Sequence, residues 1–273
     1  MKNQRILTVQ DISCVGQCSL TVALPVISAC GIETAFLPSA VLSNHTAFGE
    51  FTFCDLTAEM PKIQKSWNNQ GIKFSAIYTG YLGNLKQVKY VKELISTTLA
   101  DDAIKIIDPA MADFGRLYSG FDADYATEMK SLCLEADIIL PNITEACILT
   151  GCEYRKNLDK PFVETLLLRL NEMFGAKIIL TGVSLSPDKS GIAVCEGGNI
   201  AYYEHERVGD GTHGTGDVYA SAFTGALLCG KPLFEAAKIA ADFTVICIKN
   251  TEADHWYGVR FEKCLPKLIE MLG

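Results

Sequence analysis

A glycine-rich turn before a helix of small residues is the strongest chemical feature of this sequence. Residues 208–217 read VGDGTHGTGD and contain four glycines. Glycines let a backbone turn sharply and approach a ligand closely. The N-terminus of the helix that follows offers free N–H groups and the positive end of the helix dipole. The end of the turn, Gly214, Thr215 and Gly216, therefore predicts a hole for an anion.

Asp217 falls in the first turn of that helix, beside the predicted anion hole. A carboxylate there can accept the proton of a substrate hydroxyl that attacks a phosphoryl group, while the N–H groups hold the charge of the phosphate. A plainer alternative stays open, in which Asp217 complements the helix dipole and the glycines only make a tight turn.

Two other glycine patterns nearby lack the context that their functions need. Residues 209–214 match G-x-G-x-x-G, but helices follow instead of the strand and acidic residue of a dinucleotide site. Residues 225–231 match most of G-x-x-x-x-G-K, but Pro232 replaces the magnesium-binding Ser or Thr. We therefore assign neither pattern a nucleotide.

Two more acidic positions follow predicted strands. Asn142 and Glu145 lie three residues apart where a helix begins, so both side chains point to the same side. Asp108 ends the preceding strand. Carboxylates at neighbouring strand ends, Asp108 and Glu145, favour a magnesium site beside bound phosphates. The alternatives are a helix N-terminal carboxylate for Glu145 and a turn residue for Asp108.

Other polar and aromatic residues are candidates for binding a small aromatic substrate. The loop 43–46, SNHT, contains Ser43 and Thr46 and can hydrogen-bond a polar heterocycle. Tyr81 follows a predicted strand and can stack on an aromatic ligand, or simply lie at the rim of a pocket.

Strand-like and helix-like segments alternate along the whole chain and must position these residues. The predicted strands are 5–10, 33–38, 75–79, 103–107, 137–140, 177–180, 191–195 and 199–203. The predicted helices are 17–30, 56–69, 85–99, 122–135, 161–174, 215–229, 233–248 and 261–272. This alternation predicts one α/β domain over residues 1–273, with a mostly parallel sheet covered on both faces. The hairpin in 191–207 is a candidate β flap.

In such sheets, ligands bind beyond the carboxyl ends of the strands. Polar residues or glycines recur at the predicted strand exits, which supports a site at that edge. These exits hold Asp11, Tyr81, Asp108, Asn142 and Thr181.

Composition limits the classes of function. The chain has 273 residues, of which 49% are hydrophobic, and a net charge of −8, so a general nucleic-acid binder is not expected. No apolar run is long enough for a membrane span. The eleven cysteines are odd in number and include no C-x-x-C pair, which favours reduced packing residues in a cytoplasmic protein.

Taken together, five motifs resemble those of pyridoxal kinases, in the ribokinase-like superfamily. They are SNHT at 43–46, TGYLG at 79–83, DPAM at 108–111, PNITE at 141–145 and GTGD at 214–217. The resemblance covers nearly the whole chain. It implies a three-layer α/β/α sandwich, usually a homodimer, that transfers the γ-phosphate of ATP to the 5′-hydroxymethyl group of pyridoxal, pyridoxine or pyridoxamine. It also implies Mg²⁺, and leaves a K⁺ requirement open.

The resemblance further implies roles for single residues. Asp217 matches the catalytic base, and Gly214, Thr215 and Gly216 match the anion hole. The positions that match nucleotide or magnesium residues of the family are Asp108, Asn142, Glu145, Thr181 and Val208. The positions that match its substrate pocket are Thr46 and Tyr81.

The first strand departs from the family pattern. Pyridoxal kinases often have Gln-Ser there, with the serine on the pyridine ring, whereas this chain has Gln10 and Asp11. A carboxylate can pair with a protonated ring nitrogen or an amine, so Asp11 is a candidate for binding substrate. Segment 12–19 also lacks the Gly-Asn pair that is common after that strand.

Two other functions remain open at this point. One is a hydroxymethylpyrimidine (phosphate) kinase of thiamine synthesis, whose substrate is a similar hydroxymethyl heteroaromatic. The other is a non-catalytic ligand-binding or regulatory relative. The presence of Asp217, the glycine turn and both acidic strand ends argues against the second.

Overall fold

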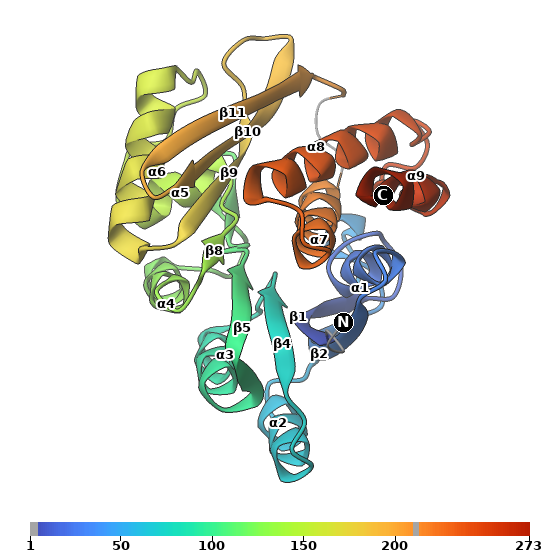
Figure 1. Cartoon of the computed structure of the whole chain (residues 1–273). Coiled ribbons are helices and arrows are strands. Elements are labelled where there is room, and N and C mark those ends of the chain that lie inside the picture. Colours follow the sequence, from blue (N-terminus) through green and yellow to red (C-terminus); the bar gives the residue numbers. More distant parts are fainter. Residues whose placement is uncertain (1–4, 210–212) are drawn as a thin grey trace.

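The structure is a computed structural model, and it describes residues 5–209 and 213–273. Its main sheet contains nine strands (Figure 1). They are β1 (Arg5–Ser13), β2 (Glu33–Leu42), β3 (Phe53–Asp55), β4 (Phe74–Thr79), β5 (Leu99–Ile107), β8 (Ile138–Ile139), β9 (Lys177–Val183), β10 (Lys189–Glu196) and β11 (Asn199–Glu206). Their spatial order is β11-β10-β9-β8-β5-β4-β1-β2-β3.

Six neighbouring strands, from β2 to β9, run parallel, and strands at both edges are antiparallel. The carboxyl ends of the parallel strands therefore meet at one edge of the sheet. The predicted hairpin forms, and it continues the central sheet as β10 and β11 instead of standing apart from it.

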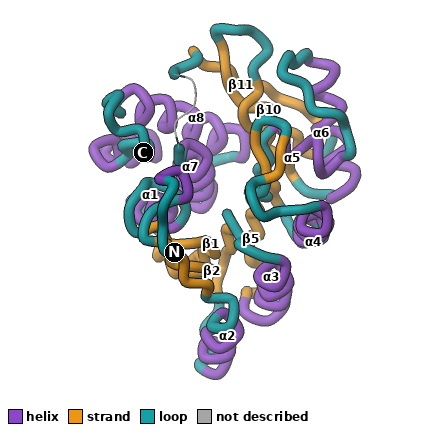
Figure 2. The backbone as a smooth tube through the Cα atoms, turned by 180° about the vertical axis from the view of Figure 1, so that it is seen from behind, coloured by secondary structure: helices purple, strands orange, loops and turns teal. Residues whose placement is uncertain are grey.

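Helices cover both faces of the sheet, which gives the three layers (Figure 2). One face carries α2 (Met60–Asn69), α3 (Leu85–Thr98), α4 (Ala123–Cys133), α5 (Ile143–Thr150) and α6 (Lys160–Phe174). The other carries α1 (Leu20–Ala29), α7 (Thr215–Leu228), α8 (Leu233–Lys249) and α9 (Leu265–Leu272). The predicted α/β/α sandwich is confirmed.

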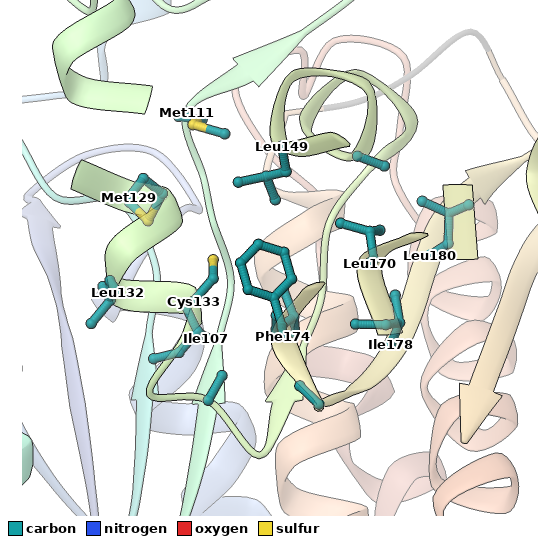
Figure 3. Packing of buried hydrophobic residues seen from close by; sticks show 14 of the residues in the cluster. Ile107, Met111, Met129, Leu132, Cys133, Leu149, Leu170, Phe174, Ile178 and Leu180 are labelled. Atoms are coloured by element: carbon teal, nitrogen blue, oxygen red, sulfur yellow. The ribbon is translucent and has the colours of Figure 1, made fainter. Parts of the chain in front are cut away.

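Each helical layer buries its own apolar core against the sheet. Figure 3 shows part of the core under α4 and α6, where Phe174 lies among Ile107, Cys133 and Ile178. The second core is built around α7 and α8. Alternate strand residues point to opposite faces, so one apolar strand serves both cores.

Small residues let α7 approach its neighbour α1. A Cβ on Gly225 of α7 would lie 2.3 Å from the Sγ of Cys30, just past the end of α1. Real atoms do not approach so closely, so glycine is required for this packing. The helix pair thus brings the N-terminus of α7 beside the loop that precedes α1.

Several predicted boundaries are wrong: β2 continues to Leu42, β5 begins at Leu99 and α2 begins at Met60. Three others lie near the candidate site. Strand β1 continues to Ser13, so Asp11 lies inside it and not after it. Strand β9 continues to Val183 and includes Thr181. Helix α1 begins at Leu20 instead of residue 17, because Ser19 has a φ of 51° and cannot belong to a right-handed helix.

Several short elements have no counterpart in the sequence analysis. They are strand β3, the two-stranded β6 (Ala112–Asp113) and β7 (Arg116–Leu117), and the 3₁₀ turn η1 (Thr46–Phe48). The predicted helix 261–272 is divided into the 3₁₀ turn η2 (Glu262–Cys264) and α9. Runs of two or three residues carry too little periodicity to predict. The β6–β7 hairpin lies against α5, at the edge where the candidate site forms.

Within residues 5–209 and 213–273, no helix has the length and apolar content needed to cross a membrane. All eleven cysteines are free thiols.

Candidate active site

Four carboxylates gather at the carboxyl edge of the parallel strands. The charge of Asp11 on β1 reaches Asp217 on α7. The charges of Asp217 and of Glu145 on α5 both reach Asp108, which follows β5. Residues more than 200 positions apart in the sequence thus form one acidic row, as the strand-exit argument predicts.

Asp217 lies in the first turn of α7 and is half-buried. Burial, together with a smaller effect of the negative charge of Asp11, raises the pKa of its carboxyl group to about 7. A hydrogen bond from the backbone N–H of Ser19 acts in the opposite direction. A pKa near the working pH suits a group that must accept a proton and later release it.

The glycine turn ends at Gly214, which is the N-cap of α7 with φ 80° and ψ 0°. A Cβ at this position would lie 1.9 Å from the backbone oxygen of Gln17. Glycine is therefore required both by the left-handed backbone and by the close approach. Thr215 and Gly216 follow as the first helical residues, so their N–H groups are free at the helix N-terminus. Positions 210–212 of the turn lie outside the described residues.

Glu145 caps its own helix and also ties down the β6–β7 segment. Its carboxylate accepts from the backbone N–H of Asn142 at 2.8 Å, of Met111 at 3.0 Å and of Ala112 at 3.4 Å. Asn142 returns a capping bond to the Glu145 N–H at 3.0 Å and donates to the Ala112 carbonyl at 2.8 Å. Glu145 is thus a helix N-terminal carboxylate, as the alternative interpretation of the sequence stated, and three of its lone pairs already accept hydrogen bonds.

Asp108 differs from Glu145 in its surroundings. Burial raises the pKa of its carboxyl group well above the usual range, and the charges of Glu145 and Asp217 raise it further. No hydrogen bond to its carboxylate occurs among the described residues. Only its backbone N–H is held, by the Thr79 carbonyl at 3.0 Å.

This arrangement fits a divalent cation such as magnesium. Neighbouring carboxylates repel one another, and a cation between them would lower that repulsion. In the described part of the chain, no group of three acidic, histidine or cysteine residues could hold a metal alone. That is expected for magnesium, which keeps several waters and takes its other ligands from phosphates.

The acceptor side of the row is built around Asp11, which is 6% exposed. Burial raises the pKa of its carboxyl group, while hydroxyl groups of Ser19 and Ser13 and the nearby His45 lower it. The Ser13 hydroxyl donates to Asp11 at 3.2 Å. The charge of Asp11 also reaches Tyr81 and, after burial, contributes to the raised pKa of the Tyr81 hydroxyl.

Tyr81 belongs to an aromatic stack. Its ring stacks on Phe121 at 5.4 Å between centroids, and Phe121 stacks on Tyr125 at 3.7 Å. The Tyr125 hydroxyl donates to the Leu82 carbonyl at 2.6 Å, which fixes the loop after β4. The stack and this hydrogen bond thus hold Tyr81 in place after β4.

The SNHT loop is braced from within. The Ser43 hydroxyl donates to Asn44 at 2.8 Å and accepts from the Thr52 N–H at 2.9 Å, so it shapes the loop. Thr46 is exposed in η1. His45 is buried: its Nδ1 accepts from the Ala47 N–H, so its Nε2 donates to the Tyr257 carbonyl at 2.7 Å. Both ring nitrogens of His45 therefore bond backbone groups, which gives this histidine a structural role in the loop.

Thr181 and Val208, the two remaining candidates for binding nucleotide, differ in their contacts with the site. Thr181 on β9 lies beside Asn142, and its N–H donates to the Pro141 carbonyl at 2.9 Å. Thr181 therefore shares the edge with the acidic row. Val208 is half-buried two residues after β11, and no contact links it to the row among the described residues.

Three residues near the site escaped the sequence analysis. Cys18 and Ser19 lie between Asp11 and Asp217, and Tyr118 lies within reach of the charges of Glu145, Asp108 and Asp217. No motif marks them, because Cys18 and Ser19 looked like the start of a helix and Tyr118 belongs to an unpredicted hairpin. Only the tertiary structure shows that these three residues lie near the carboxylates of the acidic row.

Comparison with known proteins agrees with this geometry. The phosphomethylpyrimidine kinase family model matches residues 24–259. A crystal structure from Bacteroides thetaiotaomicron, described as a phosphomethylpyrimidine kinase with pyridoxal, is 35% identical, with a TM-score of 0.92, over 98% of this chain and 96% of that chain. Pyridoxal kinase from Lactobacillus plantarum is 31% identical, with a TM-score of 0.90, over 98% and 97%.

A curated relative matches this chain over most of the length of both proteins. The pyridoxine/pyridoxal/pyridoxamine kinase of Bordetella pertussis is 26% identical over 262 residues, which are 90% of this chain and 89% of that protein. The chain therefore belongs to the phosphomethylpyrimidine kinase family and shares the ribokinase-like fold of the pyridoxal kinases.

Proposed function

We propose that this protein is an ATP-dependent kinase that phosphorylates the 5′-hydroxymethyl group of pyridoxal, pyridoxine or pyridoxamine. The observation that carries the proposal is the position of Asp217, which lies at the N-terminus of α7 directly after the glycine turn and within electrostatic reach of both Asp11 and Asp108. A base, an anion hole and an acidic metal position thus lie together.

In this mechanism, Asp217 accepts the proton of the acceptor hydroxyl as its oxygen attacks the γ-phosphorus. The N–H groups of Gly214, Thr215 and Gly216 bind the oxygens of the phosphoryl group and stabilise the charge that develops on them. Asp108 would hold magnesium directly, and Glu145 would act through water. Magnesium would neutralise phosphate charge.

Thr181 and Val208 are the proposed nucleotide-side residues, together with Asn142. Thr181 supports this role because it is bridged to Asn142 at the same sheet edge. ATP as the phosphate donor follows from the kinase family to which the chain belongs. A K⁺ requirement remains open.

Asp11, Ser43, Thr46 and Tyr81 are the proposed acceptor side. Tyr81 lies within reach of the charge of Asp11, and a flat heteroaromatic ring would lie on Tyr81 with a polar atom toward Asp11. A B6 vitamer has such a ring, and the Bacteroides relative was crystallised with pyridoxal.

The test is an ADP-release assay with each B6 vitamer and with hydroxymethylpyrimidine. Turnover with one or more vitamers, at a kcat/KM above that for hydroxymethylpyrimidine, is the expected result. Equal or faster turnover of hydroxymethylpyrimidine would support the alternative, a thiamine-pathway kinase, which the family model also favours. Binding of both compounds without turnover would overturn kinase function altogether.

We further propose a cytoplasmic homodimer made of one kinase domain per chain. The support for the dimer is an apolar sheet edge, where Phe36 on β2 is 42% exposed and Phe51 and Phe53 near β3 are 41% and 51% exposed. Sedimentation of the purified protein tests it, and a monomer at micromolar concentration would contradict it.

A further inference from the structure

The imidazole ring of His45, in the SNHT loop, is held in place by backbone groups of three segments. Its Nε2 donates to the Tyr257 carbonyl at 2.7 Å, and its Nδ1 accepts from the Ala47 N–H at 3.2 Å. A Cβ on Gly16 would lie 2.1 Å from the Cδ2 of His45, so the backbone of the loop before α1 packs directly against the edge of the ring. The ring therefore has little freedom to turn or to move away.

Aromatic residues brace the same ring from the C-terminal part of the chain. The ring of Phe48 lies 4.9 Å from that of His45 and 4.7 Å from that of Trp256, between centroids. Trp256 lies 6.4 Å from His45 in an edge-on arrangement. These distances are typical of favourable aromatic pairs, so His45 belongs to an aromatic cluster built by segments far apart in the sequence.

His213 is the residue by which the glycine turn meets this cluster. Its ring lies 5.2 Å from the ring of His45, between centroids, and is tilted by 40°. The other three histidines each hydrogen-bond a backbone carbonyl through a ring nitrogen, whereas no such bond of His213 occurs among the described residues. Packing on His45 therefore orients the His213 ring.

The place of His213 in the chain gives this contact its importance. His213 directly precedes Gly214, the N-cap of α7. Glycines leave a turn free to adopt many conformations, whereas an anion hole stabilises a transition state best when its donors are already in place. Gly214 is restrained on one side by the Gln17 backbone oxygen, 1.9 Å from where a Cβ would lie. His213 adds a second restraint, on the loop that carries Thr46.

We propose that His213 is a positioning residue, whose ring rests on His45 and so holds the N-terminal turn of α7 against the SNHT loop. The N–H groups of Gly214, Thr215 and Gly216 then keep one position relative to the acceptor. The kinetic part of this inference rests on the proposed function, in which those N–H groups bind the transferring phosphoryl group.

The first experiment needs no substrate. In the wild-type protein with isotope-labelled histidine, the ring protons of His45 and His213 should show an NOE, which the His213→Ala variant assigns. A double-mutant cycle of urea unfolding then combines His213→Ala with His45→Gln, which keeps an N–H donor for the Tyr257 carbonyl. His213→Ala should lower the unfolding midpoint at least twice as much in the wild-type background as in the His45→Gln background.

An absent NOE, or equal losses in both backgrounds, would overturn the contact between the two rings. This result stands whether or not a B6 vitamer is turned over, so it separates the positioning role from the proposed function.

The second experiment measures kcat and both KM values with whichever vitamer or pyrimidine is the better acceptor. His213→Ala should lower kcat about ten-fold with each KM within two-fold, because a misplaced anion hole weakens binding of the transition state and not of the ground state. His213→Phe keeps a ring that packs on His45, so its kcat should return to within two-fold of the wild type. Equal losses in the two variants would mean that the imidazole itself contacts phosphate, and the positioning role would be wrong.

His205→Ala is the matched control, because the His205 ring on β11 hydrogen-bonds the carbonyl of its own neighbour Glu206, at 2.9 Å. Its kcat and KM should equal those of the wild type. If His213→Ala behaves like His205→Ala, or raises a KM at unchanged kcat, His213 does not position the anion hole and the proposal is overturned.

Discussion

Gly214 lies against the backbone oxygen of Gln17, and a Cβ on Gly214 would be 1.9 Å from that oxygen. The contact joins the glycine turn before α7 to the loop before α1. Gly258 supports the same loop, because a Cβ there would lie 2.6 Å from the Cβ of Gln17. The predicted anion hole and the acceptor side therefore share one tightly packed backbone contact.

Gly214→Ala is expected to destabilise the protein by about 2–5 kcal/mol, the sum of the left-handed penalty and the steric overlap. Thermal unfolding measures the effect. Gly216→Ala is the control for stability, because a Cβ at Gly216 meets nothing within 4 Å. A Gly214→Ala protein as stable as Gly216→Ala would mean that the two loops are not packed as described.

Asp217→Asn should reduce turnover by about 10²- to 10⁴-fold and leave nucleotide binding largely intact, since the amide cannot accept the proton. The measurements are kcat by ADP release and nucleotide affinity by calorimetry. A retained rate would place the base elsewhere, and a parallel loss of nucleotide affinity would make Asp217 a binding residue instead.

The raised pKa of Asp217 should appear in the pH dependence of stability. The pKa is about 7 in the folded protein, against about 3.9 in an unfolded chain. Between these values the folded state holds a proton that the unfolded state has lost. The contribution of this group to stability is therefore full below about pH 4 and is lost as the pH rises toward 7.

Asn cannot ionise, so Asp217→Asn removes the loss of stability that occurs as the pH rises. The Tm of the variant minus the Tm of the wild type should therefore be at least about 2–4 °C larger at pH 8 than at pH 5. Asp124→Asn, at the exposed first turn of α4, is the matched control and should show no such difference. A gain that is the same at both pH values would contradict the raised pKa of Asp217.

Asp11→Ser tests ring recognition. If the carboxylate pairs with a cationic amine or ring nitrogen, its loss should lower kcat/KM for pyridoxamine about ten-fold more than for pyridoxal. Competition between the two vitamers in one assay gives this ratio directly. An unchanged preference would mean that Asp11 faces away from the substrate.

Gln87 is expected to control the acceptor pocket from a distance. This fully buried amide accepts from the Gly83 N–H at 2.6 Å and donates to the Ser39 carbonyl at 2.9 Å, so it fixes the loop that carries Tyr81. Gln87→Leu should raise the acceptor KM several-fold and leave the ATP KM unchanged.

Gln64→Leu provides the comparison, because Gln64 is also a buried amide but donates to Thr97, far from the loop. Both variants should lose about 1–3 kcal/mol of stability from unsatisfied partners. If both raise the acceptor KM equally, the effect of Gln87 comes from general destabilisation and not from the loop.

Much of the site could be predicted because parallel topology makes strand exits converge. Asp108, Asn142 and Thr181 were placed at one edge by the alternation of strands and helices alone, and the structure brings them together. The left-handed φ of Ser19 could not be predicted, since a serine before an apolar run is typical of an ordinary helix cap.

The sequence by itself determined the layer order, the parallel sheet and the chemical types at its edge, because periodicity and glycine placement are local properties of the chain. Tertiary structure alone decided that the carboxylate of Glu145 accepts from three backbone N–H groups, whereas the described residues offer no such donor to the carboxylate of Asp108. It also decided that burial raises the pKa of Asp217. These differences depend on desolvation and on which donors fold against each carboxylate, and no pattern along the chain encodes them.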